Sequence, residues 1–225
     1  MGKRQDTRDR VEAQIIELGR KHLVTEGAAG LSLRAIARDL GMVSSAVYRY
    51  VASRDELLTL LLVDAYSSLA DAVDAARPVG GDWRVDIAAI AHAARQWACA
   101  QPASWALLYG SPVPGYQAPA EQTVGPGTRV VGALFDAIAA GVAAGAIPAS
   151  KQVVPQPLSR DFDRLRDEFD FDADDLAVAK GFTLWAGLVG AISLEVFGQY
   201  GSDTVSEPGS VFELQLQLLT DMVTG

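Results

Sequence analysis

The sequence has few of the groups that most often carry catalysis or cross-linking. Its 225 residues include one cysteine, Cys99, and two histidines, and only 8% are aromatic. A single cysteine excludes a disulfide within the chain and is typical of a reducing compartment. We find no nucleophilic-serine motif, no metal-ligand cluster and no cofactor signature. We therefore expect no catalytic residues, no metal and no cofactor.

The sequence also lacks a hydrophobic run long enough to cross a membrane. Its longest uncharged apolar stretch, residues 181–194, is shorter than the roughly 18–20 residues that a membrane span needs. The start of the chain, MGKRQDTRDR, is charged and no apolar run follows it, so we expect no secretory signal. These features predict a cytoplasmic protein that does not bind membranes.

Positive charge is scarce overall but unevenly distributed. The formal net charge is −9. Residues 1–60 hold ten basic and eight acidic side chains, a net charge of +2, whereas residues 61–225 hold nine and twenty, a net charge of −11. Charges more than about 8–10 Å away are screened at physiological salt. A first part that binds a polyanion is therefore compatible with an acidic remainder.

Apolar residues at helical spacing are abundant, and alternating β-branched runs are missing, so we predict an all-α fold. A first helix from about residue 8 is expected to end at Gly27, because glycine takes the left-handed conformation cheaply. Ser32 is predicted to cap a second helix. Ser53 and Glu56 form a capping box that opens a long fourth helix, residues 53–76. The third helix, after Gly41, is predicted to bury one side, made of Val43, Ala46, Val47 and Tyr50.

Beyond residue 76 the pattern predicts a bundle of further helices. They are expected over residues 83–100, 102–109, 128–146, 174–200 and 211–223. A loop rich in proline and glycine is expected over 111–127. An acidic stretch is expected over 160–175, with a solvated turn and helix start at residues 170–175. The predicted organisation is a first helical domain over 1–60 and a larger helical domain over 61–225.

The second and third helices, with the glycine turn between them, are typical of a helix-turn-helix motif at about residues 31–50. The side of the third helix opposite its buried residues carries Ser44, Ser45, Tyr48 and Arg49. Small hydroxyls, a phenol and a guanidinium suit a groove lined by phosphates and base edges. The motif therefore predicts binding to double-stranded DNA.

Residues 10–58 resemble the N-terminal domain of the TetR family of transcriptional regulators. The matching positions are Gly27, Ser32-Leu33, Ile36-Ala37, Gly41-Met42-Val43-Ser44, Tyr48-Arg49-Tyr50-Val51 and Ser53-Arg54-Asp55-Glu56-Leu57. Three positions depart from the family pattern: Tyr50 stands where His is common, Val51 where Phe is usual, and Arg54 where Lys is usual.

The resemblance implies a role for each residue of the DNA-binding face. Backbone phosphates would be held by Ser32, Arg34, Tyr48, Tyr50 and Arg54. Bases would be approached by Ser44, Ser45 and Ala46, with Ala46 suited to a thymine methyl group, and Arg49 could contact either. Two alternatives remain open: Tyr50 as a core residue, and Arg54 as a solvated residue at the helix start.

In this family the second domain is a helical bundle that forms a homodimer through its last helices and often encloses a ligand. Residues 185–195 also resemble a Trp-His-Gly signature of one subgroup, with Val189 in place of the histidine. The resemblance implies dimer contacts by Leu188, Ile192, Val196, Phe212, Leu216 and Leu219. Two such domains would match a palindromic operator.

A small-molecule pocket is expected to be mostly apolar with a few polar groups. Candidate ligand-binding residues are His92, Trp97, Trp105, Tyr109, Phe135, Phe182 and Trp185, and any of them could instead be plain bundle core. Few ionisable groups lie among these rings, so the ligand is expected to be largely apolar.

The sequence thus predicts a DNA-binding transcriptional regulator, and the resemblance implies that it is a repressor. Such a ligand would release it from its operator or change its affinity for the operator. The alternative is a helical ligand-binding module or enzyme whose first three helices make protein contacts. The sequence offers no catalytic constellation to support that alternative.

Overall fold

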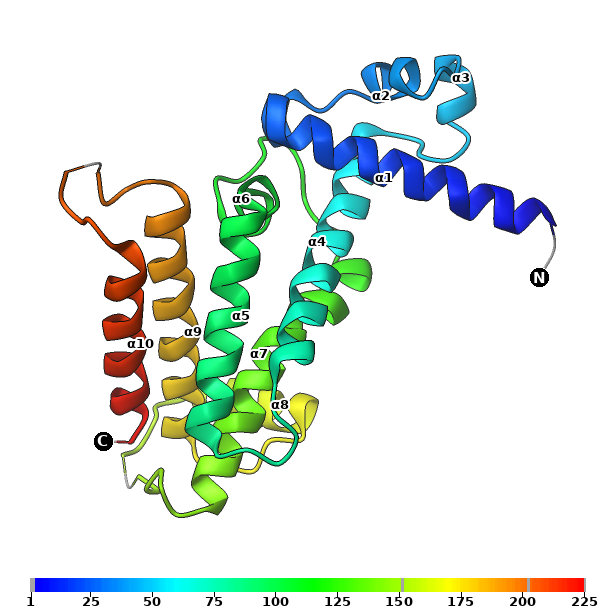
Figure 1. Ribbon diagram of the computed structural model, residues 1–225. Coiled ribbons are helices and arrows are strands. Elements are labelled where there is room, and N and C mark those ends of the chain that lie inside the picture. Colours follow the sequence, from blue (N-terminus) through cyan, green and yellow to red (C-terminus); the bar gives the residue numbers. More distant parts are fainter. Residues whose placement is uncertain (1–2, 151, 202, 225) are drawn as a thin grey trace. The chain divides into compact units, whose positions relative to one another are not determined.

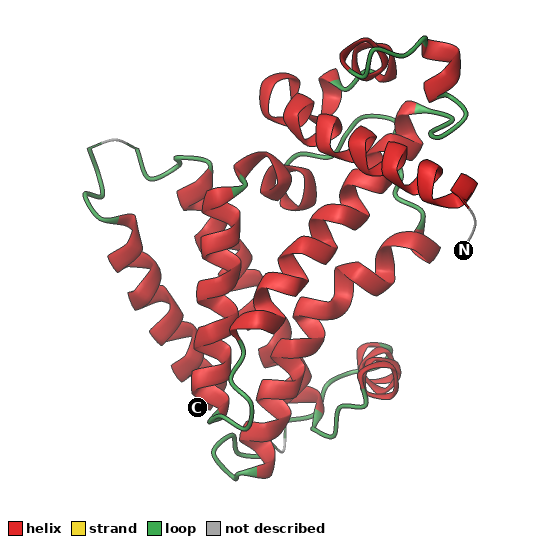
Figure 2. Cartoon of the chain, turned by 45° about the vertical axis from the view of Figure 1, so that its right-hand side comes forward, coloured by secondary structure: helices red, strands yellow, loops and turns green. Residues whose placement is uncertain are grey.

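The structure is a computed structural model that describes residues 3–150, 152–201 and 203–224, with the side chains of residues 3–5 left out. Throughout this described part the chain forms helices and no strand (Figure 2). The all-α prediction is therefore confirmed. The helices group into two compact units, Met1–Ser68 with Gln101–Gly127, and Leu69–Ala100 with Thr128–Gly225. The domain boundary at residue 60 stays a prediction.

The first unit contains α1 (Lys3–Gly30), α2 (Leu33–Asp39), α3 (Ser44–Val47) and α6 (Pro102–Tyr109), labelled in Figure 1. It also takes the first part of α4 (Arg54–Ala76) and of α7 (Ala120–Ala143). α1 packs against both α2 and α6. One apolar core joins these helices, with fully buried side chains at Ile15, Ile36, Val47, Val51, Leu57 and Leu58.

The helix ends and starts in this unit are set by the turn and capping residues that the sequence predicts. Gly27 has a φ of 67° and breaks the regular helix before Gly30, although helical structure already begins at Lys3. The Ser32 Oγ accepts a hydrogen bond from the Ala35 amide at 3.4 Å. At the start of α4, the Ser53 Oγ accepts from the Glu56 amide at 3.0 Å. The Glu56 carboxylate in turn accepts from the backbone amide of Ala52 at 2.5 Å.

The second unit contains α5 (Trp83–Ala100), α8 (Leu158–Phe169), α9 (Asp175–Val196) and α10 (Pro208–Thr224), with the remainders of α4 and α7. α9 packs against α5, α8 and α10, and Figure 1 shows α9 and α10 side by side. Of the helices in the described residues, α9 alone is long and apolar enough to cross a membrane, with a mean hydropathy of 1.5. This differs from the expectation drawn from the shorter uncharged run over 181–194, because the helix continues past the charged residues at either end of that run. Leu184, Leu188 and Ile192 of α9 are buried within the chain, as expected for a core helix.

Helices occupy two segments that were not predicted to be helical. The loop expected over 111–127 ends at residue 119, because α7 already begins at Ala120 and includes Pro126. Proline removes only one hydrogen bond from a helix, and burial along the rest of α7 outweighs that loss. The acidic stretch over 160–175 contains α8, which buries Phe162. Helix α9 starts as predicted, with the Asp174 carboxylate accepting from the Ala177 amide at 2.8 Å.

Candidate nucleic-acid interface

The helix-turn-helix consists of α2, a turn at Gly41 and the short helix α3. Gly41 has a φ of 67°, a conformation that a side chain would strain. After α3 the chain continues in hydrogen-bonded turns, in which the Arg49 amide donates to the Ala46 carbonyl at 3.2 Å. The amide of Tyr50 donates to the Val47 carbonyl at 2.9 Å. These turns hold residues 48–50 in a fixed orientation next to α3.

The inward side of α3 differs from the prediction at one residue. Val47 is fully buried, and Tyr50 is half-buried against the core. Val43, which was expected to point inward, is 71% exposed. Val43 precedes the first helical turn and has an extended backbone, with φ −68° and ψ 141°, so helical spacing does not govern its direction. Met42 packs against the core instead.

The outward side of the motif is polar and basic, as predicted. Ser45, Tyr48 and Arg49 are exposed, whereas Ser44 and Ala46 are half-buried. On α2, Arg34 is exposed and Ser32 is half-buried. Residues 31–53 contain three arginines and one aspartate, a net charge of +2. This segment therefore offers hydroxyl, phenol and guanidinium groups on a positively charged stretch inside an acidic chain.

Arg54 has a different contact from the one expected. Its Nη2 donates to the carbonyl oxygens of Ala28 and Ala29, at 2.9 and 3.1 Å. These carbonyls lie at the end of α1, where a helix leaves acceptors without partners. The Arg54 guanidinium therefore caps α1 in this structure, and a phosphate contact by Arg54 stays a prediction. Tyr50 has the Arg8 guanidinium 5.8 Å from its ring centroid.

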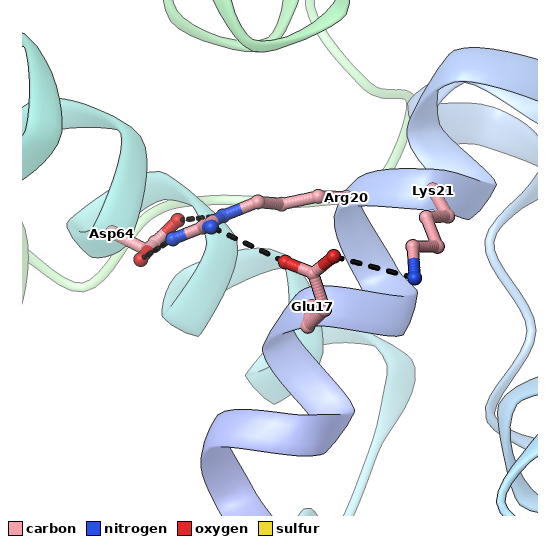
Figure 3. Close-up of polar contacts among 4 residues, drawn as sticks. All are labelled: Glu17, Arg20, Lys21 and Asp64. Carbon is pink, nitrogen blue, oxygen red and sulfur yellow. Dashed lines mark hydrogen bonds and ion pairs between the residues drawn. The ribbon is translucent and has the colours of Figure 1, made fainter.

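Further polar contacts fix α1 to its neighbours. Arg20 donates to the Asp64 carboxylate through two nitrogens, at 2.7 and 2.5 Å, and joins α1 to α4 (Figure 3). The Asp64 hydrogen bond raises the pKa of the Arg20 guanidinium above its ordinary value. Glu17 lies between Arg20 and Lys21 in the same network. The His22 Nε2 and an Asp39 oxygen lie 2.7 Å apart, which joins α1 to α2.

Two of the predicted ligand-binding residues lie in the first unit. Trp105 is fully buried, and its ring centroid is 4.4 Å from that of Tyr109. Burial, and to a lesser degree the nearby Tyr66 phenol, raises the pKa of Tyr109 well above its ordinary value. The Tyr116 hydroxyl lies 2.9 Å from the buried Thr59 hydroxyl. Sequence reasoning missed this pair of hydroxyls, because Thr59 on α4 and Tyr116 in the loop after α6 lie 57 positions apart in the sequence.

The other candidates lie in the second unit. Phe135 is buried, with its ring centroid 5.8 Å from that of the partly exposed Phe182. Trp97 is buried and Trp185 is half-buried. His92 lies on the surface 2.9 Å from the Glu213 carboxylate, beside a groove of about 510 Å³. In the described residues no cluster of three His, Cys, Asp or Glu could hold a metal ion.

The predicted dimer residues are mostly core residues of a single chain. Leu188, Ile192, Phe212 and Leu216 are buried, with exposures of 6% or less, because they pack α9, α10 and α5 against one another. These four side chains therefore pack within the single chain, and their contact with a second copy stays a prediction. Val196 and Leu219 are half-buried. The exposed apolar side chains of α10 are Leu214 and Leu218, at 58% and 61%.

The chain is similar to known proteins over most of its length. Residues 87–219 match a family model described as the Tetracyclin repressor-like, C-terminal domain. The chain is 65% identical over 221 residues to the HTH-type transcriptional regulator Rv1816 of Mycobacterium tuberculosis. The matched region covers 97% of this chain and 94% of that protein. The HTH-type transcriptional regulator Mb1846 of Mycobacterium bovis is similar to the same extent.

Solved structures show the same fold. The regulatory protein SCO4313 matches 98% of this chain and 100% of its own, with a TM-score of 0.79 and 34% identity. The transcriptional regulator FadR from Bacillus subtilis, solved in complex with stearoyl-CoA, has a TM-score of 0.62. At 12% identity, with 91% of this chain and 97% of that chain covered, FadR shares the fold with this chain.

Proposed function

The chain belongs to the TetR family of transcriptional regulators, and from this premise we propose that its helix-turn-helix binds a palindromic operator and represses transcription. The observation that carries the proposal is the exposure of Ser45 on α3 and of Tyr48 and Arg49 in the turns that follow it. These groups can donate to phosphates and base edges, and Val47 on the other side anchors the helix in the core. The relatives are named transcriptional regulators, so an enzyme or a protein-binding trihelix is not favoured.

The predicted phosphate and base contacts are retained except at Ala46, which is half-buried, and at Arg54. Ser32, Arg34, Ser44, Ser45, Tyr48 and Arg49 remain the proposed contacts, with Tyr50 at their edge. Arg54 is proposed to position α4 instead, since its guanidinium already binds α1 carbonyls. DNA is the site of action, which supports a cytoplasmic protein.

We also propose a homodimer formed through the outer face of α9 and α10. The exposed residues of α9 include Ala186 and Gly190, and those of α10 include Leu214 and Leu218. Small residues on one helix and leucines on its neighbour allow close packing with a second copy. A twofold dimer would present two α3 helices to two half-sites about 34–36 Å apart.

A largely apolar ligand is proposed to shift the affinity for the operator. Support comes from two features of the first unit: the buried Trp105 with the half-buried Tyr109 against its ring, and the Thr59 and Tyr116 hydroxyls 2.9 Å apart. A few polar groups in apolar surroundings are typical of ligand sites. The related fold of the regulator solved with stearoyl-CoA is consistent with this. The ligand would act by binding one arrangement of the dimer more tightly than another.

The test is fluorescence anisotropy with the DNA upstream of its own gene, measured from about 50 to 200 mM salt. Tyr48→Phe removes only a hydroxyl that is proposed to donate to a phosphate. It should weaken binding to every duplex by about 1.5 kcal/mol per subunit, roughly tenfold. Tyr200→Phe makes the same change where the hydroxyl donates to Gln215 in the second unit, and should leave affinity unchanged. An affinity independent of salt would contradict phosphate-anchored binding.

A further inference from the structure

Val43 places an apolar side chain on the outside of the helix-turn-helix. The side chain is 71% exposed, and its backbone carbonyl accepts the first hydrogen bond of α3, from the Ala46 amide at 2.9 Å. The core does not need this side chain, because Met42 packs inward at the same turn. A single exposed valine is ordinary by itself. Its place at the start of α3 is what distinguishes Val43.

Residues at the N-terminal end of a recognition helix are the ones that contact base edges in the major groove. Val43 directly precedes the first turn of α3, next to Ser44 and the exposed Ser45. A duplex that accepts hydrogen bonds from these serines would therefore also contact the valine. Exposed Arg34 and Arg49 supply positive charge on the same motif.

The chemistry of the valine side chain restricts which base edge it can recognise. An isopropyl group neither donates nor accepts a hydrogen bond. In the major groove of unmodified DNA, the apolar group on a base edge is the C5-methyl of thymine. A β-branched side chain is also stiff about χ1, so it loses little freedom on contact. A polar base edge facing Val43 would lose water without a hydrogen bond in exchange.

We propose that Val43 recognises the C5-methyl group of one thymine in each half-site of the operator. The inference rests on the proposed function, DNA binding by the helix-turn-helix. It moves the thymine contact from Ala46, which is half-buried, to the side chain that stands out from the motif.

The experiment replaces each thymine of the bound DNA with deoxyuridine, which removes only the methyl group. A duplex selected from a random pool by the wild-type protein serves as the operator. At one thymine per half-site the replacement should weaken binding about fourfold, and about fifteenfold when both half-sites are changed. This part of the experiment uses the wild-type protein, so its result does not depend on whether a variant folds.

The second arm repeats the measurement with Val43→Ala, which should bind the thymine and deoxyuridine duplexes equally well. Val24→Ala is the matched control, because Val24 is a valine of the first unit with 73% exposure; it should keep the wild-type methyl effect. The melting temperature of both variants should match that of the wild type.

Three results would overturn the inference. If wild-type binding shows no methyl effect at any thymine, Val43 reads no methyl group. If Val43→Ala keeps the full effect while Ala46→Gly loses it, the contact belongs to Ala46. If the wild-type protein binds no duplex at all, the proposed function fails together with this inference, which distinguishes that outcome from the first two.

Discussion

Replacing Arg54 with methionine tests whether this arginine caps α1 or holds DNA. Methionine has a similar length and keeps the apolar stem, but it has no hydrogen-bond donor. The substitution removes both bonds from Nη2 to the Ala28 and Ala29 carbonyls, at 2.9 and 3.1 Å. It leaves the Ser53 capping interaction at the start of α4 in place.

The expected loss of stability is modest. Hydrogen bonds from a charged donor contribute about 1.5–3 kcal/mol when well shielded. The Arg54 side chain is 34% exposed, so water replaces part of the interaction. We expect Arg54→Met to lower the free energy of unfolding by about 1–2 kcal/mol, measured by urea denaturation. DNA affinity should also fall, because the junction between α1 and α4 positions the helix-turn-helix.

The salt dependence of DNA binding separates positioning from phosphate contact. Each phosphate contact contributes about 0.9 to the slope of log affinity against log salt, so losing one in each half-site of a dimer changes it by about 1.8. We expect Arg54→Met to weaken binding with the slope unchanged. Arg34→Met, at an exposed arginine of α2, should lower the slope by about 1.8 and leave stability unchanged.

The opposite pattern would refute this reasoning. If Arg54→Met reduced the slope by about 1.8 and did not lower the free energy of unfolding, Arg54 would be a phosphate ligand in the complex. Its bonds to the α1 carbonyls would then contribute nothing to the fold. The original prediction from the family pattern would be restored.

Gly181→Ala should lower the free energy of unfolding by about 1–3 kcal/mol, because a methyl group there would lie 2.4 Å from the Phe135 ring. In a Phe135→Leu background, denaturation should show a smaller loss of stability for the same substitution. An equal loss in both backgrounds would contradict the clash. Leu218→Glu on the outer face of α10 should convert the proposed dimer to monomers in sedimentation velocity, whereas Val85→Glu, at an exposed valine of α5, should not. Hydrogen bonds from Ser159 and then Arg166, both on α8, lower the pKa of Asp175. The ionised Asp175 therefore stabilises the fold above about pH 3.9, and this stabilisation is lost as the pH falls through the lowered pKa. Asp175→Asn should therefore reduce the acid sensitivity of the melting temperature, and an unchanged pH profile would refute this.

Local signals made much of the first unit predictable from the sequence. Gly27 and Gly41 adopt the positive φ expected of turn glycines, and Ser32 and Ser53 cap their helices as read. Each of these features depends on residues within four positions of one another. Such features follow from backbone geometry and hydrogen bonding, which the order of residues specifies directly.

The direction in which a side chain points, and the residues it packs against, were harder to predict from the sequence. Val43 follows the helical spacing in sequence, but its backbone is extended, so it points outward. Leu188 and Phe212 were correctly seen as apolar, yet periodicity does not tell whether their partner is the same chain or a second copy. The Arg20–Asp64 pair joins residues 44 positions apart, and no local spacing relates two charges at that separation. Helix α8 was not predicted, although Phe162 and Phe169 lie seven residues apart, at helical spacing, among its acidic residues.

The most direct test of the central claim is selection of bound duplexes from a random DNA pool by the purified full-length protein. If the outward face of α3 reads bases in a homodimer, the enriched sequences should share one palindrome with half-site centres about 34–36 Å apart along the helix. Enrichment of a single unpaired half-site would contradict the proposed symmetry. Recovery of no common sequence would contradict recognition of bases by this face.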